Sequence, residues 1–327
     1  MKVLVTGAGG FLGQHVVRCL RTRGHTVRAL VRRPATAFAS AGGGVEMAVA
    51  DLRNAPLPAL LDGIDAVVHV AATMAGDDFA IFAGTMAGTE RLFDALAQSP
   101  VRRLVLVSSF SVYDWTRVGR QLNEGSPLLT HPWTGGGYAA AKIWQERLAR
   151  RLTATTGITL TILRPGFIWS MDGPLPACFG VTVGRLFCVI GPWRKPPLTH
   201  VANCADAVAA AVDAPGAVNR TFNVVDNSGI TAWQWAGAHI RQEGRGWRFP
   251  LPEVLARLLT RAIDVVCTAI FGATRKLPSL CDPLRHAGRF APVCVDVRSL
   301  ERELVWTPPR ARFSELVLTE DPRSPSA

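Results

Sequence analysis

The sequence predicts an α/β protein: a doubly wound parallel sheet in the first half, then a smaller, mostly helical part that binds substrate. Three observations predict this class. Apolar runs of strand length alternate with helical patterns as far as residue 165. Glycines join the first strand to the first helix. Beyond residue 169 the alternation stops and the pattern becomes less regular.

The first half contains six apolar runs separated by helical patterns or loops. The expected strands are 2–6, 26–31, 45–52, 66–72, 103–109 and 159–165, and the expected helices are 11–24, 88–99 and 140–157. Strands that alternate with helices of this length imply right-handed crossovers and a parallel sheet. We expect residues 1–168 to form a dinucleotide-binding domain, to which residues 198–226 return.

The second half is expected to hold the substrate. Residues 169–197 and 227–318 make up this part, and the Pro- and Ser-rich residues 319–327 form a flexible tail. Its most apolar stretch, 254–272, is too short and too charged to cross a membrane comfortably. Polar residues recur there at helical spacing. We expect a helix packed in the smaller part, with a peripheral membrane or dimer contact as the alternative.

The composition excludes several classes of protein. Of the 327 residues, 48% are hydrophobic, enough for a sizeable core. The seven Cys are odd in number and lack a C-x-x-C pair, which indicates reduced thiols and neither a disulfide framework nor a metal site. The chain opens on a strand, so we expect no signal peptide and a cytoplasmic protein. The net charge of +11 comes from scattered Arg, and we expect no nucleic-acid partner.

The glycine pattern TGAGGFLG at 6–13 predicts a phosphate-binding loop. Gly7, Gly10 and Gly13 are spaced for a tight turn, a close approach to a pyrophosphate and close packing of helix on strand. Phe11 and Leu12 begin the helix whose free N–H groups face the phosphates. The strand–loop–helix context favours a Rossmann-type cofactor site over a turn that only packs the chain.

The end of the second strand bears on the choice of cofactor. A carboxylate there would accept from a ribose 2′-OH, but the strand TVRALV is followed by Arg32 and Arg33. Arg suits a phosphate through its bidentate fork. We therefore expect NADP(H) rather than NAD(H). The alternatives are NAD(H) binding, or Arg side chains that face water.

The stretch YAAAK at 138–142 indicates an acid/base pair. The chain has two Tyr and only four Lys, so about 0.02 pairs are expected at this spacing by chance. Residues four apart share one face of a helix, which places Lys142 beside Tyr138. An adjacent ammonium should lower the pKa of the phenol toward the working range. A guanidinium is bulkier and would not replace Lys there.

The residues quoted so far, with others in order along nearly the whole chain, resemble the extended short-chain dehydrogenase/reductases. The further motifs are ADL at 50–52, HVAA at 69–72, VSSFSVY at 107–113, LRPGFIW at 163–169, HVANCADA at 200–207, FNVVDNSGIT at 222–231 and VDVRSLERELVWTPP at 295–309. The family includes nucleotide-sugar epimerases and dehydratases and 3β-hydroxysteroid dehydrogenases. The resemblance implies a Rossmann-type fold and a nicotinamide cofactor.

The resemblance also assigns residues by position. It places Asp51 and Leu52 at the adenine, and Ala71 and Ala72 along the ribose and phosphates. It makes Pro165 a cofactor contact. Ser109 would be the catalytic hydroxyl, with Ser108 and Ser111 as neighbours that could exchange roles with it. Tyr138 and Lys142 would be both the catalytic pair and cofactor contacts.

Two departures from the family pattern affect the expected substrate. Thr85 stands where the family usually has an Asn, and Gly166 stands where nucleotide-sugar members usually carry an Asn that helps to hold the sugar nucleotide. The second departure favours a less polar substrate. Several aromatic residues of the second half would suit such a pocket, although most are expected in the core: Trp169, Phe179, Phe187, Trp193, Trp233 and Trp235.

The expected function is an NADP(H)-dependent oxidoreductase that interconverts a ketone or aldehyde and an alcohol on an apolar small molecule. Tyr138 would exchange the proton while Ser109 steadies the oxygen. The alternatives are a nucleotide-sugar epimerase or dehydratase and a cofactor-sensing protein without turnover. The expected partners are the small-molecule substrate and a second copy in a homodimer.

Overall fold

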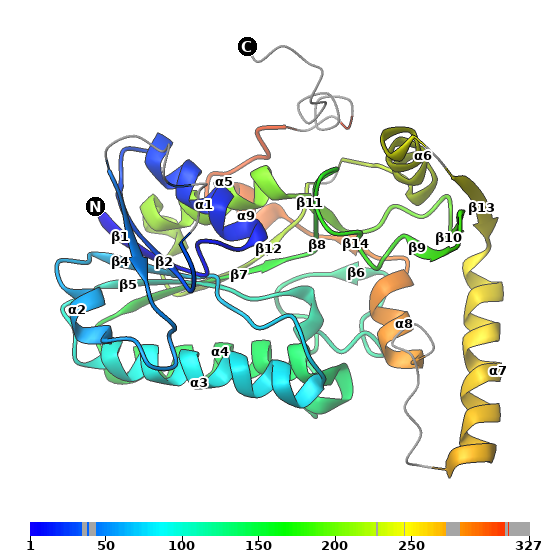
Figure 1. The fold of residues 1–327 in the computed structure, drawn as a ribbon, viewed down its shortest axis with the longest axis horizontal. Coiled ribbons are helices and arrows are strands. Elements are labelled where there is room, and N and C mark those ends of the chain that lie inside the picture. Colours follow the sequence, from blue (N-terminus) through cyan, green and yellow to red (C-terminus); the bar gives the residue numbers. More distant parts are fainter. Residues whose placement is uncertain are drawn as a thin grey trace.

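Seven parallel strands form the central sheet of the computed structural model (Figure 1), in the order β12-β7-β5-β4-β1-β2-β3. The structure describes residues 1–34, 38, 44–226, 228–244, 246–272, 282–310 and 313, so the expected tail at 319–327 lies outside the described residues. The strands are β1 (Lys2–Thr6), β2 (Thr26–Val31), β3 (Val45–Val49), β4 (Ala66–His69), β5 (Arg103–Val107), β7 (Thr159–Pro165) and β12 (Arg220–Val224). The order reverses between β1 and β4, and sheets of this type bind ligands at that point.

Helices cover both faces of the sheet (Figure 1). On one face lie α1 (Phe11–Thr22) and α5 (Val201–Asp213), and on the other lie α3 (Asp78–Ala97) and α4 (Gly136–Thr155). Side chains alternate along each strand: Val3 and Val5 of β1 join the core under α1 and α5, whereas Leu4 joins the core under α3 and α4. Both faces are therefore apolar, which explains the nearly continuous hydrophobic runs in the sequence.

All six expected strands begin at the predicted residue, three of them end earlier than expected, and one helix begins well before its expected start. β1, β2 and β7 have the predicted bounds. α3 begins at Asp78, ten residues before the expected helix at 88–99. The side chain of Asp77 caps it by accepting from the backbone N–H of Ala80 at 2.8 Å. Glycines and small residues in its first turns hide the apolar periodicity, while an Asp cap of this kind stabilises a helix start.

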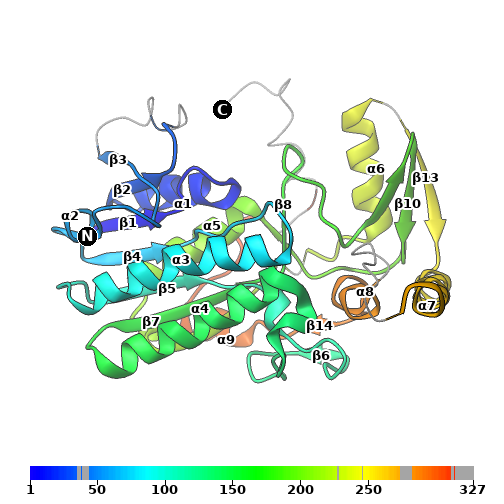
Figure 2. The same cartoon turned by 60° about the horizontal axis from the view of Figure 1, so that its bottom comes forward.

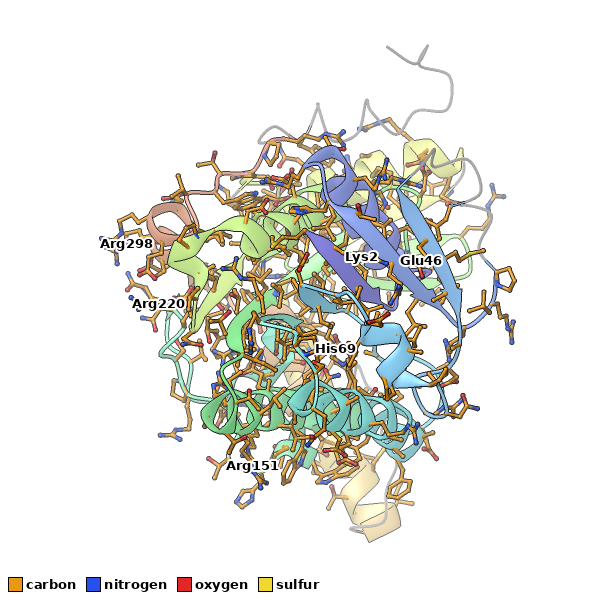
Figure 3. All side chains as sticks on the ribbon, turned by 90° about the vertical axis from the view of Figure 1, so that its left-hand side faces the viewer. Lys2, Glu46, His69, Arg151, Arg220 and Arg298 are labelled. Atoms are coloured by element: carbon orange, nitrogen blue, oxygen red, sulfur yellow. The ribbon has the colours of Figure 1, made fainter. Side chains whose placement is uncertain are left out.

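Charged and polar groups occupy different depths at the two ends of the sheet (Figure 3). Lys2 of β1 forms an ion pair of 3.0 Å with Glu46 of β3 at the surface. His69, at the end of β4, lies inside, where it contacts both α3 and α4. Arg151, Arg220 and Arg298 lie around the periphery. One group of buried polar side chains thus lies at the end of the sheet where β4 leads into its loop.

The second half of the chain builds a separate layer beside the sheet (Figure 2). A three-stranded sheet, β13-β10-β9, packs against α6 (Ala232–Glu243). Its strands are β9 (Gly180–Val183), β10 (Leu186–Ile190) and β13 (Trp247–Leu251). Two pairs of short strands, β8 (Phe167–Trp169) with β11 (Leu198–His200) and β6 (Gln121–Leu122) with β14 (Cys294–Val295), connect it to the large sheet. The remaining helices are α2 (Leu57–Leu61), α7 (Glu253–Phe271), α8 (Pro283–Phe290) and α9 (Arg298–Glu303).

The expected helix at 254–272 is present as α7, but its packing differs from the expectation. Ala256 and Thr260 are buried, and the helix contacts α8. Seven of its large apolar side chains are exposed to solvent, so only one stripe of α7 packs in the smaller part. Among the described residues, no helix has the length and apolar character needed to cross a membrane.

Candidate functional site

The glycine loop lies at the end of β1, where the strand order reverses. Gly7 has φ of +69°, and a Cβ there would come within 2.9 Å of the backbone of Ala71. A Cβ at Gly13 would collide with the carbonyl oxygen of Gly7. Gly10 caps α1 without a side chain, and it is exposed. Phe11 and Leu12 open the helix, so its first N–H groups have no side-chain acceptor and are available to an anion.

The loop after β4 comes close to the glycine loop from the neighbouring strand. Ala71 and Ala72 lie in it, half-buried. The backbone N–H of Ala71 points to the Thr6 hydroxyl at 3.4 Å, and that of Thr73 donates to the Thr85 hydroxyl at 2.9 Å. Thr85 thus anchors this loop to α3, at the position where the family usually has an Asn.

A buried group of polar side chains ties these loops to α4, and sequence reasoning missed it. The Nδ1 of His69 is 2.8 Å from the Thr6 hydroxyl, and its Nε2 is 3.0 Å from the Gln145 amide. Gln145 also donates to Thr89 at 2.8 Å. Burial, aided by the charge of Lys142, lowers the pKa of His69 to about 3. A permanently neutral imidazole links β1, β4, α3 and α4 without titrating near neutral pH.

The structure brings Ser109, Tyr138 and Lys142 together. The Ser109 hydroxyl hydrogen-bonds to Tyr138, and it also accepts from the backbone N–H of Ser111 at 3.1 Å. The Nζ of Lys142 lies 5.8 Å from the centre of the Tyr138 ring. Ser109 follows β5, while Tyr138 and Lys142 are one turn apart on α4. The three side chains therefore meet at the carboxyl ends of the central strands.

The pKa of the phenol differs from the expectation. Packing around Tyr138 raises the pKa of its phenol above the usual value, and the hydrogen bond with Ser109 opposes that rise. Lys142 donates to the carbonyl oxygen of Val107 at 2.8 Å instead of contacting the phenol oxygen. Burial lowers the pKa of Lys142 itself to about 8, against the effect of Glu146. The prediction that Lys142 lowers the pKa of Tyr138 is wrong for this conformation, because desolvation dominates.

A second buried network, also missed from the sequence, lies beside the turn of α4 that bears Tyr138 and Lys142. Glu146 accepts from the Ser108 hydroxyl at 2.5 Å and forms an ion pair with Arg164 at 2.7 Å. Arg164 also donates to the hydroxyl of Tyr113, which donates to Asn223 at 2.6 Å. Although burial raises it, the pKa of Glu146 stays below its usual value because of Arg164. Glu146 follows Lys142 by four residues, and this spacing was the available signal.

The expected adenosine contacts lie around the ends of β2 and β3. Arg32 and Arg33 are exposed directly after β2. Hydrogen bonds from Arg53 hold the pKa of Asp51 at about 2, and the charge of Arg32 contributes to this. The two Arg53–Asp51 side-chain contacts measure 2.7 and 3.0 Å. Leu52 packs where a Cβ on Gly88 would lie.

Positions 165 and 166 lie where β7 leads into β8. Pro165 is the last residue of β7 and pairs with Val224 of β12. A Cβ on Gly166 would collide with the carbonyl oxygen of Pro197, so the backbone excludes any larger residue there.

Most aromatic residues of the second half form core. Trp169, Phe179, Phe187 and Trp235 are buried together, and the rings of Phe179 and Trp235 stack at 3.9 Å. Trp233 is half-buried, and Trp193 is 75% exposed. Four of the six aromatic residues therefore fill the interior of the smaller part, and only Trp193 and Trp233 remain as candidates to line a substrate pocket.

The cofactor-binding fold and the Tyr–Lys–Ser arrangement define the class of nicotinamide-dinucleotide-binding proteins. The sequence profile of the NAD-dependent epimerase/dehydratase family matches residues 3–171. The chain belongs to this family of extended short-chain dehydrogenase/reductases.

Known relatives include reductases and dehydrogenases. The chain is 31% identical over 223 residues to a 4-hydroxy-2-methyl-3-oxo-4-farnesyl-3,4-dihydroquinoline-1-oxide ketoreductase of Stigmatella aurantiaca, a match to 66% of each chain. It is 33% identical to a 3 beta-hydroxysteroid dehydrogenase/Delta 5-->4-isomerase of Mycobacterium tuberculosis, over 51% of this chain and 47% of that protein. The matches thus span about half to two thirds of these relatives.

Solved structures share the fold. A UDP-glucuronic acid 4-epimerase from Bacillus cereus, in complex with UDP-glucuronic acid and NAD, superposes with a TM-score of 0.72. The superposition covers 97% of this chain and 96% of the epimerase, at 18% identity. At this identity the likeness supports the expected Rossmann-type architecture and says nothing about the substrate.

Proposed function

We propose that the protein is an NADP(H)-dependent reductase or dehydrogenase that interconverts a carbonyl and an alcohol on an apolar small molecule. The observation that carries the proposal is the meeting of Ser109, Tyr138 and Lys142 at the carboxyl ends of the central strands. A protein that only binds cofactor does not need a phenol bonded to a hydroxyl with a buried ammonium one helical turn away.

The residues of the glycine loop fit the cofactor, and other residues have separate roles in the reaction. Gly7, Gly10 and Gly13 leave room for a pyrophosphate at the start of α1. The nicotinamide, when bound, supplies or accepts the hydride. Tyr138, whose raised pKa keeps it protonated at neutral pH, donates its proton to the carbonyl oxygen during reduction. Ser109 donates a hydrogen bond to the same oxygen as negative charge develops.

Lys142 keeps a positive charge beside this group at neutral pH, because its pKa of about 8 lies above 7. Its bond to Val107 fixes the ammonium against β5. We propose that Lys142 orients the nicotinamide ribose and stabilises the charge on Tyr138 during proton transfer.

The apolar character of the substrate rests on side chains near Tyr138. Trp133, five residues before Tyr138, packs on Phe79 and Phe82 of α3 with ring centres 6.4 and 4.8 Å apart. Phe79 and Met74 are more than 70% exposed. The names of two relatives, a farnesyl-dihydroquinoline-oxide ketoreductase and a hydroxysteroid dehydrogenase, agree with an apolar substrate. The solved epimerases keep a nucleotide sugar as the second candidate.

The preference for NADP(H) rests on Arg32 and Arg33, because no carboxylate ends β2. The proposed partners are the substrate and the cofactor, without nucleic acid. The homodimer expected from the sequence stays a prediction that light scattering tests.

The decisive experiment screens ketones, alcohols and nucleotide sugars with NADPH and NADH, with absorbance at 340 nm as the readout. A stoichiometric absorbance change with an apolar ketone supports the proposal. Conversion of a nucleotide sugar without a net absorbance change contradicts it and supports an epimerase.

The Tyr138→Phe variant tests the assigned acid. It should bind cofactor but lose about 10²- to 10⁴-fold in turnover. Tyr113→Phe is the matched control, since Tyr113 is the other Tyr of the chain and bonds to Asn223 and Arg164. More than a third of wild-type activity in Tyr138→Phe would exclude this role.

A further inference from the structure

One side of α7 presents an uninterrupted apolar face to solvent. Seven large side chains on this face are each between 54 and 67% exposed: Val254, Leu255, Leu258, Leu259, Val265, Val266 and Ile270. Their spacing of three, four and seven residues places them on one side of a helix. Ala262, which is also exposed, lies among them. We call this set the α7 face.

The opposite side of α7 is already in use, so the α7 face is not needed to hold the helix. Ala256 packs with Ile190 and Phe290 in a small buried cluster. Thr260 is buried and lies 3.3 Å from His286 of α8. The helix is therefore attached along one stripe, and its apolar side chains face solvent. Figure 1 shows α7 beside α8 at the edge of the molecule.

The outer side of the three-stranded sheet continues this apolar character. On β10 and β13, Leu186 pairs with Trp247 and Cys188 pairs with Phe249. Trp247 is 75% exposed and Phe249 is 53% exposed. The alternate residues point the other way: Phe187 is buried near α6, and Arg248 stacks on Trp233 of α6. The sheet thus covers α6 with one side and shows aromatic rings to solvent on the other.

α7 follows β13 directly, and both lie at the same end of the molecule in the two views (Figures 1 and 2). A helix of 19 residues extends about 28 Å. Exposed apolar surface on this scale marks an interaction site in proteins that are otherwise well packed.

Charge distinguishes between the candidate occupants. Arg257 and Arg261 border the α7 face, and Arg257 also lies 3.7 Å from Glu253. Both are exposed, so their heads can reach a charged surface while their stems lie along it. The chain as a whole carries a net charge of +11. A second copy would bring the same positive charge and the same Arg border into contact, which is unfavourable. An anionic lipid surface has the complementary sign, and Trp favours the interface between lipid and water.

We propose that the α7 face and the outer side of the β10–β13 sheet dock onto the surface of an anionic phospholipid membrane, with α7 lying in the plane of the interface. The attachment would be peripheral, through the α7 face and the exposed aromatic rings of β13. The proposal does not depend on the reaction that the site performs, because the residues of the surface are separate from Ser109, Tyr138 and Lys142.

Vesicle co-sedimentation of the full chain tests the proposal. The vesicles contain phosphatidylcholine alone, or phosphatidylcholine with about 30% phosphatidylglycerol, which supplies the anionic surface. The wild type should bind the anionic vesicles at least tenfold more tightly than the neutral ones. Absence of binding to both kinds of vesicle would overturn the proposal.

Variants locate the binding surface. Leu258→Glu places one negative charge on the α7 face and should weaken binding at least tenfold. Thr268→Glu is the matched control, because it adds the same residue to the polar side of the same helix. Trp247→Gln tests the sheet independently and should weaken binding at least threefold. Circular dichroism and cofactor binding verify that each variant is folded.

The controls separate the docking surface from its competitors. Equal loss in Thr268→Glu would show a general charge effect and overturn the assignment to the α7 face. Light scattering tests whether a second copy of the chain occupies the α7 face instead. If the wild type is a dimer that Leu258→Glu dissociates, and it does not bind vesicles, the α7 face is a contact between copies and the membrane proposal is rejected.

Discussion

The hydroxyls of Ser108 and Ser109, adjacent in the chain, have different partners on α4. Ser108 donates to Glu146 at 2.5 Å, while Ser109 bonds to Tyr138. The hydroxyl of Ser111 is buried with no hydrogen-bond partner among the described residues. Of the three serines that the sequence offers, Ser109 is thus the one that hydrogen-bonds to the phenol. We therefore propose Ser109 as the catalytic hydroxyl and Ser108 as a structural one.

Ser109→Ala should therefore lower turnover by about 10- to 100-fold, since it removes a donor to the developing oxyanion. The same change removes the bond that lowers the pKa of Tyr138, so the alkaline limb of the pH–rate profile should move to higher pH. Ser111→Ala is the control, with turnover close to wild type. If Ser111→Ala is the more damaging variant, the assignment of the catalytic hydroxyl is wrong.

Lys142→Arg should be nearly as damaging as Tyr138→Phe, with a loss of about 10²-fold or more. Lys142 is 2% exposed, and its Nζ donates to Val107, so a guanidinium has neither the space nor the geometry. Arg151→Lys on the exposed side of α4 makes the reverse exchange and should leave turnover unchanged. Steady-state kinetics and cofactor titration check both variants. Wild-type kinetics for Lys142→Arg would show that any cation serves there.

Arg32→Ala should remove most of a preference for NADPH over NADH of about 10- to 100-fold, because one Arg–phosphate pairing contributes about 1.5–3 kcal/mol. Affinity for NADH should be nearly unchanged. Val31→Asp with Arg32→Ala should invert the preference, since a carboxylate repels the 2′-phosphate and accepts from a free 2′-OH. Fluorescence titration of both cofactors measures these changes. NADH binding as tight as NADPH binding in the wild type would contradict the NADP(H) proposal.

Asp226 should make the protein less stable as pH rises from 4 to 7. Burial raises the pKa of its carboxyl from 3.8 to about 6, against the effects of His200, Asn203 and Thr199. The folded state then binds a proton that the unfolded state has released, so stability falls as pH rises through 6. The shift corresponds to about 3 kcal/mol.

Asp226→Asn lacks this titration and serves as the reference. Urea unfolding of both proteins at pH 4 and pH 7 should show the wild type losing about 2 kcal/mol relative to the variant, because at pH 4 the unfolded carboxyl is already more than half ionised. Parallel pH dependences would mean that Asp226 titrates alike in both states.

The sequence predicted the central sheet well, because buried parallel strands such as β1, β2 and β7 are continuous apolar runs bounded by polar or turn residues. The start of α3 was missed, since Asp77 caps a helix whose first turns show no clear apolar stripe. In the site, the pattern YAAAK identified Tyr138 and Lys142 as neighbours, because residues four apart in a helix lie on the same face. Which serine faces Tyr138 depends on how the end of β5 packs against α4. The spacing of residues in the sequence does not show this packing.

The same limit applies to Glu146 and Arg164. They are 18 residues apart in sequence and on different elements, so only the packing of α4 on β7 shows that they form a buried ion pair. The pKa of Tyr138 was also mispredicted, because the sequence gives the identity of a neighbouring cation but not the degree of burial. Burial on α7 was overestimated for the same reason.

The ion pair between Arg285 and Asp78, at 2.5 Å, joins α8 to the first turn of α3. Asp78 also accepts from the backbone N–H of Gly137, the residue before Tyr138. A single carboxylate thus links α8, which contacts α7, to the peptide group that precedes Tyr138. Because both partners are partly exposed, dissolved salt weakens this link. Ionic strength is then expected to alter turnover through the placement of the phenol, even with an uncharged substrate.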